Sequence, residues 1–326
     1  MATYFVSDAT GDDADDGLSE ANAFLTIDKA MNTVAAGDKV WVKADGTYTE
    51  DALIDTVGTG TAHIIWEGYT TTPGDNGQVT MVAASVSCIA KGTAATFAFI
   101  GYVFRNFKFT GGSGDAFGAW SGNTWLFDNC EFSGAGAYGC GGGSANQMLF
   151  HNCVITGNTS GATNLEKWCF FIHCKIHGNS GTDGARCTNI IAIGCLVYDN
   201  AATNGANFQS DAAGSINILY GNTIDGENGT SVVGWEQTNS SPGMSLVMNN
   251  ILYDCDKGVK RATAQNDSAV IGFNLINSNA TADYENCENN AGGDVITAPN
   301  FTDEAGDDYT LGSSDAVDAG VDLGNV

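Results

Sequence analysis

A short motif of alternating apolar and polar residues recurs eight times through the middle of the chain, with examples such as LFDNCEFSG from Leu126 and LFHNCVITG from Leu149. The centres of the eight copies lie 21 to 28 residues apart. They are Phe107, Cys130, Cys153, Cys174, Cys195, Asn222, Asn250 and Asn274. A near-constant period of this length, built from strand-forming residues, is typical of a β-solenoid in which each repeat forms one coil.

Positions around each centre divide into inward, outward and turn columns. The column two residues after the centre is apolar, as Phe109, Phe132 and Ile155 show, and so is the column three residues before it. Directly before the centre stand Asn106, Asn129, Asn152, His173, Gly194, Gly221 and Asn249. Asn and Gly tolerate left-handed backbone angles, so this column predicts a sharp bend between two strands. Leucine-rich repeats share the period, but their consensus and its helical half are missing.

These repeats resemble the right-handed parallel β-helix superfamily, the pectate-lyase-like fold. The opening segment from Tyr4 to Glu50 is similar to the entry cap of that family, and the segment from Pro299 is similar to its exit. Ile27, Ala30, Met31 and Val34 recur at helical spacing before Gly37, which predicts a short capping helix that plugs the open end of the solenoid. The resemblance therefore implies an all-β, single-stranded parallel β-helix of about ten coils.

Domain organisation follows from the repeats, which continue without a linker or a change in composition. We expect one domain, with an N-terminal cap at residues 1–38, coils at 39–290 and a C-terminal cap or exit segment at 291–326. Forty-three glycines and only three prolines fit an architecture with many tight turns. Proteins with this fold include lyases, glycosidases, adhesins and phage spikes, so the resemblance leaves the function open.

Charge and segment composition restrict the partners. The chain has 38 acidic and 12 basic residues, a net charge of −26, which argues against nucleic acid and anionic membranes. We find neither a signal peptide nor a membrane-spanning stretch, and expect no membrane insertion. The ten cysteines lack CxxC spacing, so the ladder Cys130, Cys153, Cys174 and Cys195 is interpreted as buried thiols of a protein that folds in a reducing compartment.

Outward columns beside the bend carry charges of opposite sign on successive coils. Asp128 follows Arg105, and Glu131 follows Lys108, one repeat later. Such pairs are typical of cross-strand contacts that hold the register of the coils. The alternative is that Asp128, Glu131 and His151 line a cleft in which carboxylate and imidazole share acid and base roles.

A second candidate catalytic group is Glu236 with Lys260 and Arg261, about one coil later. The calcium and catalytic motifs of pectate lyases and polygalacturonases are absent from the sequence, so no catalytic set is assigned. We expect no cofactor. Ca²⁺ held by the acidic cap residues is the alternative. The candidate ligands are Asp12, Asp13, Asp15 and Asp16.

Eight apolar residues occupy one outward column, four positions before each centre. This stripe consists of Val103, Leu126, Leu149, Phe170, Ile191, Ile218, Leu246 and Val270. A soluble monomer rarely exposes such a surface. Three explanations stay open: the chain's own turns cover the stripe, the inward and outward assignment is reversed there, or the stripe is a subunit interface.

The functional hypothesis is a non-catalytic structural or adhesive protein of a phage virion surface (a decoration, fibre or spike subunit), assembled in host cytoplasm as a trimer or with other virion proteins. The alternative is a polysaccharide lyase or glycoside hydrolase that acts on a glycan along the flank of the solenoid. A glycan-binding module is a third reading. Its stacking platforms would be Tyr198, Tyr253, Trp120 and Trp235.

Overall fold

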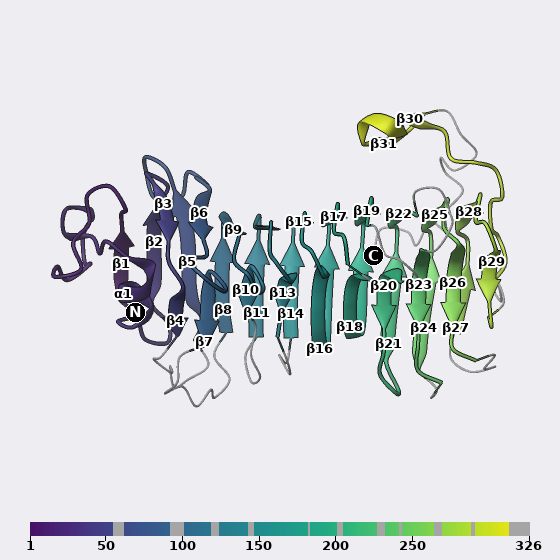
Figure 1. The fold of residues 1–326 in the computed structure, drawn as a ribbon, viewed down its shortest axis with the longest axis horizontal. Helices are drawn as coiled ribbons and strands as arrows, with labels where there is room; N and C mark the ends of the chain where they lie inside the picture. The colour runs from purple at the N-terminus through teal and green to yellow at the C-terminus, as the bar shows by residue number, and fades with distance from the viewer. Residues whose placement is uncertain are drawn as a thin grey trace. The chain divides into compact units, whose positions relative to one another are not determined.

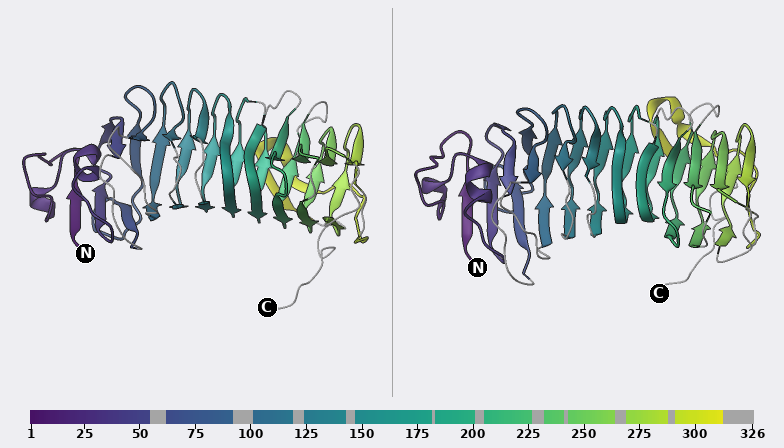
Figure 2. Two further views of the ribbon diagram at one scale, coloured as in Figure 1. Left: turned by 90° about the horizontal axis from the view of Figure 1, so that it is seen from below. Right: turned by 60° about the horizontal axis from the view of Figure 1, so that its bottom comes forward.

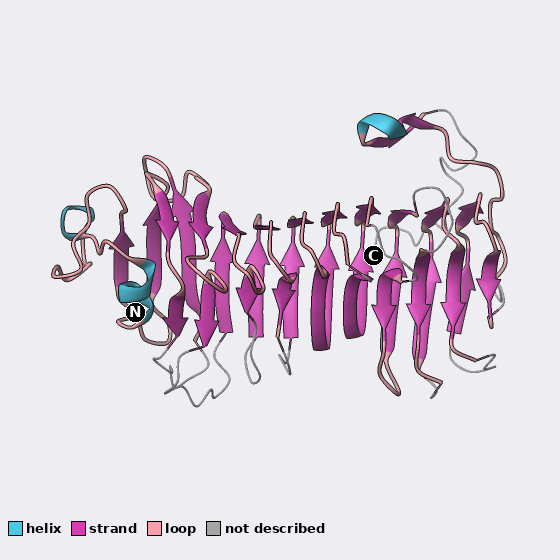
Figure 3. Cartoon of the chain, viewed as in Figure 1, coloured by secondary structure: helices cyan, strands magenta, loops and turns pink. Residues whose placement is uncertain are grey.

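A computed structural model describes residues 1–54, 62–91, 101–118, 124–142, 147–181, 183–200, 205–226, 232–240, 243–263, 269–287 and 291–312. These residues fall into two compact units, unit 1 (Met1–Phe170) and unit 2 (Phe171–Val326). Both units are all-β parallel solenoids with almost no helix, as Figures 1 and 3 show. The expected domain boundaries at residues 38 and 290 stay a prediction.

Unit 1 is built from three ladders of parallel strands among the described residues. The first ladder consists of β1 (Thr3–Val6), β2 (Lys39–Lys43), β5 (Ile64–Tyr69), β8 (Gly101–Arg105), β11 (Thr124–Asp128) and β14 (Gln147–His151). The second consists of β3 (Thr47–Thr49), β6 (Val79–Val82), β9 (Phe107–Thr110), β12 (Glu131–Ser133) and β15 (Val154–Thr156). The third consists of β4 (Ala52–Ile54), β7 (Ile89–Lys91), β10 (Phe117–Gly118), β13 (Tyr138–Gly141) and the start of β16 (Gly161–Ile172).

Unit 2 repeats the same three ladders. Its first ladder consists of the end of β18 (Asp183–Ile193) with β21 (Ile216–Tyr220), β24 (Met244–Met248) and β27 (Ala269–Gly272). The second consists of β17 (Lys175–His177), β19 (Leu196–Tyr198), β22 (Thr223–Asp225), β25 (Ile251–Tyr253) and β28 (Leu275–Asn277). The third consists of the start of β18 with β20 (Ala206–Ser210), β23 (Val233–Gln237), β26 (Lys257–Arg261) and β29 (Ala282–Glu285). Figure 2 shows the stacked coils from two further sides.

The bend between the first and second ladders uses the predicted turn column. Asn106, Asn129, Asn152 and His173 have φ values of 61°, 54°, 51° and 52°. Asparagine populates this left-handed region more readily than most residues with a side chain. The predicted bend is therefore confirmed, and it fixes which residues on each side point inward.

Aromatic side chains fill the lumen of unit 1. Phe104, Phe127 and Phe150 from the first ladder are fully buried. Phe109 and Phe132 from the second ladder pack against them, with ring centroids 5.7 Å apart for Phe104–Phe109 and 4.9 Å apart for Phe127–Phe132. The predicted inward columns are confirmed.

The lumen of unit 2 is more polar and contains an asparagine ladder. The side-chain oxygen of Asn222 accepts a hydrogen bond from Cys195 N, and Asn250 does the same for Asn222 N. Asn274 repeats the contact to Asn250 N. Amide side chains that form hydrogen bonds with a neighbouring coil can be buried at a small cost in free energy, whereas amides without a hydrogen-bond partner cannot.

Buried thiols occupy the equivalent column on the preceding coils. In unit 1, Cys130 and Cys153 donate to the carbonyls of Phe104 and Phe127. In unit 2, a hydrogen bond with Cys174, together with burial, raises the pKa of the Cys195 thiol. Nine of the ten cysteines are buried, as expected for thiols that pack as small apolar groups.

The N-terminal segment differs from the prediction in its helix. α1 spans Ile27–Met31 and ends at Asn32 rather than at Gly37, while the short 3-10 helix η1 spans Glu20–Asn22. Ile27, Ala30 and Met31 are buried, and α1 packs against β4 and β1. The predicted plug stays a prediction. No described helix could cross a lipid bilayer.

The C-terminal segment of unit 2 ends in a separate hairpin. It consists of β30 (Phe301–Asp303), the 3-10 helix η2 (Glu304–Gly306) and β31 (Asp308–Leu311), and its two strands are antiparallel.

Candidate functional site

The outer face of the first ladder in unit 1 carries the apolar stripe. Leu126, Leu149 and Phe170 are half-buried and point outward, because the flanking Trp125 and Phe127 are fully buried in the lumen. The explanation that inward and outward were reversed is therefore wrong. Val103 belongs to the same column but is buried.

The stripe forms the floor of a groove of about 330 Å³. Thr124, Gln147 and His63 contribute to its lining beside the apolar residues. Gly101 has no side chain, and a Cβ at this position would lie only 1.6 Å from Nδ1 of His63. The glycine therefore lets the exposed imidazole lie close against the first ladder. Trp168 extends the apolar surface, because its ring stacks on Phe170 at 6.2 Å.

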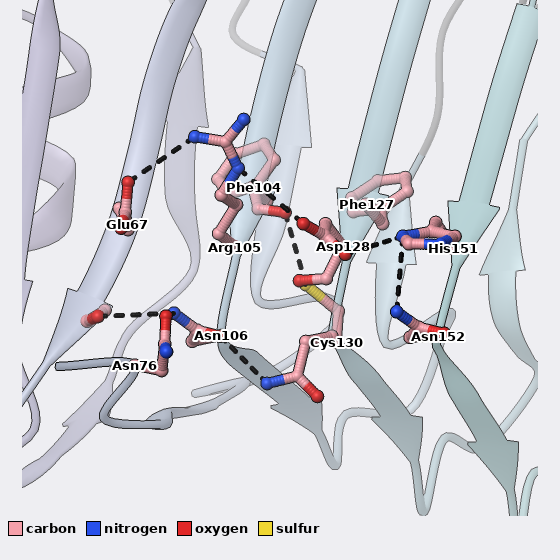
Figure 4. Close-up of polar contacts among 12 residues, drawn as sticks. Glu67, Asn76, Phe104, Arg105, Asn106, Phe127, Asp128, Cys130, His151 and Asn152 are labelled. Carbon is pink, nitrogen blue, oxygen red and sulfur yellow. Dashed lines mark hydrogen bonds and ion pairs between the residues drawn. The ribbon is translucent and has the colours of Figure 1, made fainter. Parts of the chain in front are cut away.

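A ladder of alternating acidic and basic side chains occupies the next outward column on the same strands (Figure 4). Glu67, Arg105, Asp128 and His151 stand opposite one another on β5, β8, β11 and β14. Arg105 lies 3.5 Å from Glu67 and 3.8 Å from Asp128, and Lys39 lies 3.0 Å from Glu67. We call these four stacked residues the charge ladder. The predicted pairing of Arg105 with Asp128 is confirmed.

His151 and Asp128 form an imidazole–carboxylate pair at the end of the charge ladder. His151 Nδ1 lies 2.9 Å from Asp128 Oδ1 and 3.3 Å from the side-chain nitrogen of Asn152. When Nδ1 carries the proton and donates to Asp128, Nε2 is left as an acceptor. This is the arrangement in which a carboxylate orients a histidine for proton transfer.

Glu131, the third member of this predicted group, lies on the second ladder. Its carboxylate forms an ion pair with Lys108 at 2.8 Å, as the sequence predicts for a register contact. The bend at Asn129 separates β11 from β12 and turns the two strands to different ladders. Of the three candidates, Asp128 and His151 are in direct contact.

The second predicted group is divided by the alternation of β26. Lys260 points outward and forms an ion pair with Glu236 at 2.6 Å. Arg261, the next residue, is 3% exposed, and its Nε donates to Gln237 Oε1 in the interior. Successive side chains of a strand face opposite sides, so Arg261 cannot act on the same ligand as Lys260 and Glu236.

Comparison with solved structures identifies the fold. A pectate lyase, Pel9A, superposes with a TM-score of 0.52 at 14% identity, over 93% of this chain and 83% of its own. This chain has the pectate-lyase-like parallel β-helix fold. A rhamnogalacturonan lyase and a XylC–xylose complex align at 13% and 10% identity, with TM-scores of 0.47 and 0.48. The lyase alignment covers 91% of this chain and 87% of the other, and the XylC alignment covers 82% and 71%. No protein-family model and no curated protein matches the sequence.

In unit 2 no charged side chain occupies the outward positions beside this column among the residues that the structure describes. Its stripe residues Ile191, Ile218, Leu246 and Val270 stand opposite one another on four strands. Beside them, Ile193, Tyr220 and Met248 lie on one side, and Asn189, Ile216 and Met244 lie on the other. Met244 and Val270 are 49% and 46% exposed, so this apolar face of unit 2 reaches solvent.

Aromatic residues predicted as stacking platforms are placed differently by the pectate-lyase-like fold. Trp235 is fully buried in the lumen, and Tyr198 is covered by Tyr309 of the C-terminal hairpin. Tyr253 contacts Phe301 of the same hairpin, and Trp120 lies outside the described residues. The sequence does not identify Trp168 as an aromatic residue of the groove, because Trp168 lies outside the repeat motif.

The predicted calcium ligands serve local backbone contacts in the N-terminal loop of this β-helix. Asp13 accepts hydrogen bonds from Leu25 N and Thr26 N, and Asp12 and Asp16 accept from amides two residues ahead. Among the described residues, no group of three or more acidic, histidine or cysteine side chains is arranged to hold a metal ion.

Proposed function

We propose that this chain is a carbohydrate-binding protein that holds a glycan in the groove of unit 1. The observation that carries the proposal is the groove of about 330 Å³, whose apolar floor lies directly beside the charge ladder. Sugars present apolar C–H faces and polar hydroxyl edges, so a site for them combines both kinds of surface.

The groove offers each kind of contact. Leu126, Leu149 and Phe170 provide apolar area, and Trp168 adds an aromatic ring beside Phe170. Hydroxyl groups could be bound by Thr124 and Gln147 within the groove, and by the charge ladder at its side.

A neutral glycan suits this site better than an acidic one. Arg105, the cation of the charge ladder, already lies between two carboxylates. The chain as a whole has a net charge of −26, which repels polyanions.

We further propose that the protein cleaves the bound glycan, as a lyase or glycoside hydrolase does. This cleavage would depend on His151 as the proton-transferring group and Asp128 as its positioning partner. His151→Asn would then abolish the release of new reducing ends while leaving glycan affinity within about threefold. If the unmodified protein releases no reducing ends and His151→Asn lowers the glycan affinity, the His151–Asp128 pair serves binding alone.

A second candidate function, a structural surface subunit such as one of a phage virion, is favoured by the apolar face of unit 2. We propose that a second copy of this chain covers it, in a trimer or larger assembly. Chains that each carry a charge of −26 repel one another. The stripe residues of four strands and their described outward neighbours, none of them charged, give two copies a surface on which that repulsion is weakest and apolar burial is largest.

Two matched substitutions separate these functions. Leu126→Asp and Leu246→Asp change the same outward column, one in the groove and one in the apolar face of unit 2. We expect Leu126→Asp to weaken binding of neutral hexasaccharides by about tenfold or more and to leave the native mass unchanged. Leu246→Asp should reduce the native mass and leave the affinity unchanged. Calorimetry and light scattering measure the two effects.

Each variant is the control for the other, because both introduce an aspartate in the same outward column and any general loss of folding would affect both measurements. If Leu126→Asp leaves the affinity for neutral hexasaccharides unchanged, the groove is not a glycan site. If the unmodified protein is a monomer at every concentration, the apolar face of unit 2 is not an interface between copies.

A further inference from the structure

The groove of unit 1 has a regular cross-section, because the outward residues of β8, β11 and β14 lie in register. They form three rows, one on each strand. The rows are Gly101, Val103 and Arg105 on β8, Thr124, Leu126 and Asp128 on β11, and Gln147, Leu149 and His151 on β14. Neighbouring rows are about 4.8 Å apart, and neighbouring columns are about 7 Å apart. The two leucines therefore lie in the middle, with the charge ladder on one side of them (Figure 4).

Three polar side chains form the opposite edge of the groove. Thr124 and Gln147 occupy the outward column two residues before the leucines, and His63 lies where Gly101 leaves space in that column. We call His63, Thr124 and Gln147 the polar edge. Among the residues that the structure describes, no protein group forms a hydrogen bond with these three side chains. Their donors and acceptors are therefore available to a ligand.

The leucines limit what a sugar can place in the middle of the groove. A pyranose ring whose hydroxyl groups contact Asp128 and His151 extends over Leu126 and Leu149. A hydroxyl group directly above the leucines would lose water without gaining a hydrogen-bond partner, because the polar edge begins about 7 Å further along the strands. A substituent that ends in a methyl group would instead bury apolar area against the leucines.

An acetamido group is complementary to both the leucines and the polar edge. Its methyl group can pack on Leu126 and Leu149. Its planar amide has a donor and an acceptor, and both can pair with the carboxamide of Gln147. A deoxy sugar such as fucose would supply a methyl group but nothing that pairs with the polar edge. The acetamido group is also uncharged, which suits a chain with a net charge of −26.

We propose that the sugar held over Leu126 and Leu149 is an N-acetylated hexosamine, with its acetamido group between the leucines and the polar edge. This inference rests on the proposed glycan site and names the class of sugar that the site selects. Gln147 determines the selectivity, because its exposed carboxamide pairs with the acetamido group. The leucines, by contrast, contact the ring of any neutral sugar.

Two neutral oligosaccharides that differ only in this substituent test the proposal. They are chitohexaose and cellohexaose, hexamers of N-acetylglucosamine and of glucose with the same linkage, and calorimetry measures the affinity for each. We expect chitohexaose to bind about tenfold or more tightly, since an apolar pocket distinguishes even a single methylene by at least about tenfold. NMR titration with the methyl glycosides of N-acetylglucosamine, glucose, N-acetylgalactosamine and galactose repeats the comparison without a linkage between sugars.

A matched pair of glutamine substitutions identifies the selective contact. Gln147→Ala should lower the affinity for chitohexaose by about fivefold, as the loss of a hydrogen bond does, and leave the affinity for cellohexaose within about twofold. Gln209→Ala changes a half-buried glutamine on β20 in unit 2 and should alter neither affinity.

The outcomes distinguish this inference from the proposed function. Measurable but equal affinities for the paired sugars would overturn the acetamido proposal and leave the groove as a glycan site. A preference for chitohexaose that Gln147→Ala leaves intact would also overturn it. If no sugar of the set binds, the glycan site itself is wrong, and the acetamido proposal is wrong with it.

Discussion

Replacing Phe104 with alanine is expected to lower the free energy of unfolding of unit 1 by about 3–5 kcal/mol. The ring is fully buried and lies between Trp66 on one coil and Phe127 on the next, with centroids 6.0 and 5.8 Å away. It also meets Phe109 and Phe117 edge to face. Its removal leaves a cavity against side chains of both neighbouring coils, which cannot close without moving the ladders.

Urea unfolding followed by circular dichroism measures this loss. Arg105→Ala is the matched control, since it changes the next residue of the same strand on the outer face. We expect it to change stability by about 1 kcal/mol or less, as exposed ion pairs do. A Phe104→Ala loss no larger than that of Arg105→Ala would show that the aromatic lumen does not determine the stability of unit 1.

Replacing Asn250 with alanine should destabilise unit 2 by roughly 3–5 kcal/mol, because several buried groups lose their partners at once. The Asn250 side chain accepts hydrogen bonds from the main-chain and side-chain nitrogens of Asn222. Its own amide nitrogen donates to the carbonyls of Leu219 and Met248. The substitution removes the middle of the asparagine ladder and leaves polar atoms of two coils unsatisfied.

Asn249→Gly is the control for this substitution. Asn249 precedes Asn250 at the bend, with a φ of 57°, and glycine adopts that angle without strain. We expect a change of about 1 kcal/mol or less, measured by the same denaturant titration. Equal losses for the two variants would mean that the buried hydrogen bonds of Asn250 contribute no more to stability than the side chain of Asn249.

The sequence was sufficient for the features that repeat with every coil. Asn106 and Asn129 predict the bend because left-handed angles restrict the residue type, and Phe109 and Phe132 predict the lumen because strand alternation is strict. The same alternation should have separated Lys260 from Arg261. The prediction grouped them because they are adjacent in sequence, although adjacent residues of a strand face opposite sides.

Features that depend on single contacts outside the repeats were missed. His63 reaches the groove from before the first recognised motif, through the space left by Gly101. The C-terminal hairpin reaches Asp225 from 84 residues further along the chain. Nothing in a local sequence pattern encodes such contacts. The helix α1 also ends before the predicted Gly37, and its buried face packs against β4 and β1.

The charge ladder makes the coils of unit 1 non-interchangeable. Aromatic residues recur inside successive coils, so the lumen alone would tolerate the loss or duplication of a coil. If the coil carrying Arg105 were deleted, Glu67 would stand directly opposite Asp128, and two carboxylates would meet at the spacing of adjacent strands, roughly 4.8 Å. Recombination between these similar repeats would therefore yield chains with mismatched charges, and selection against them would preserve both the number and the order of the coils.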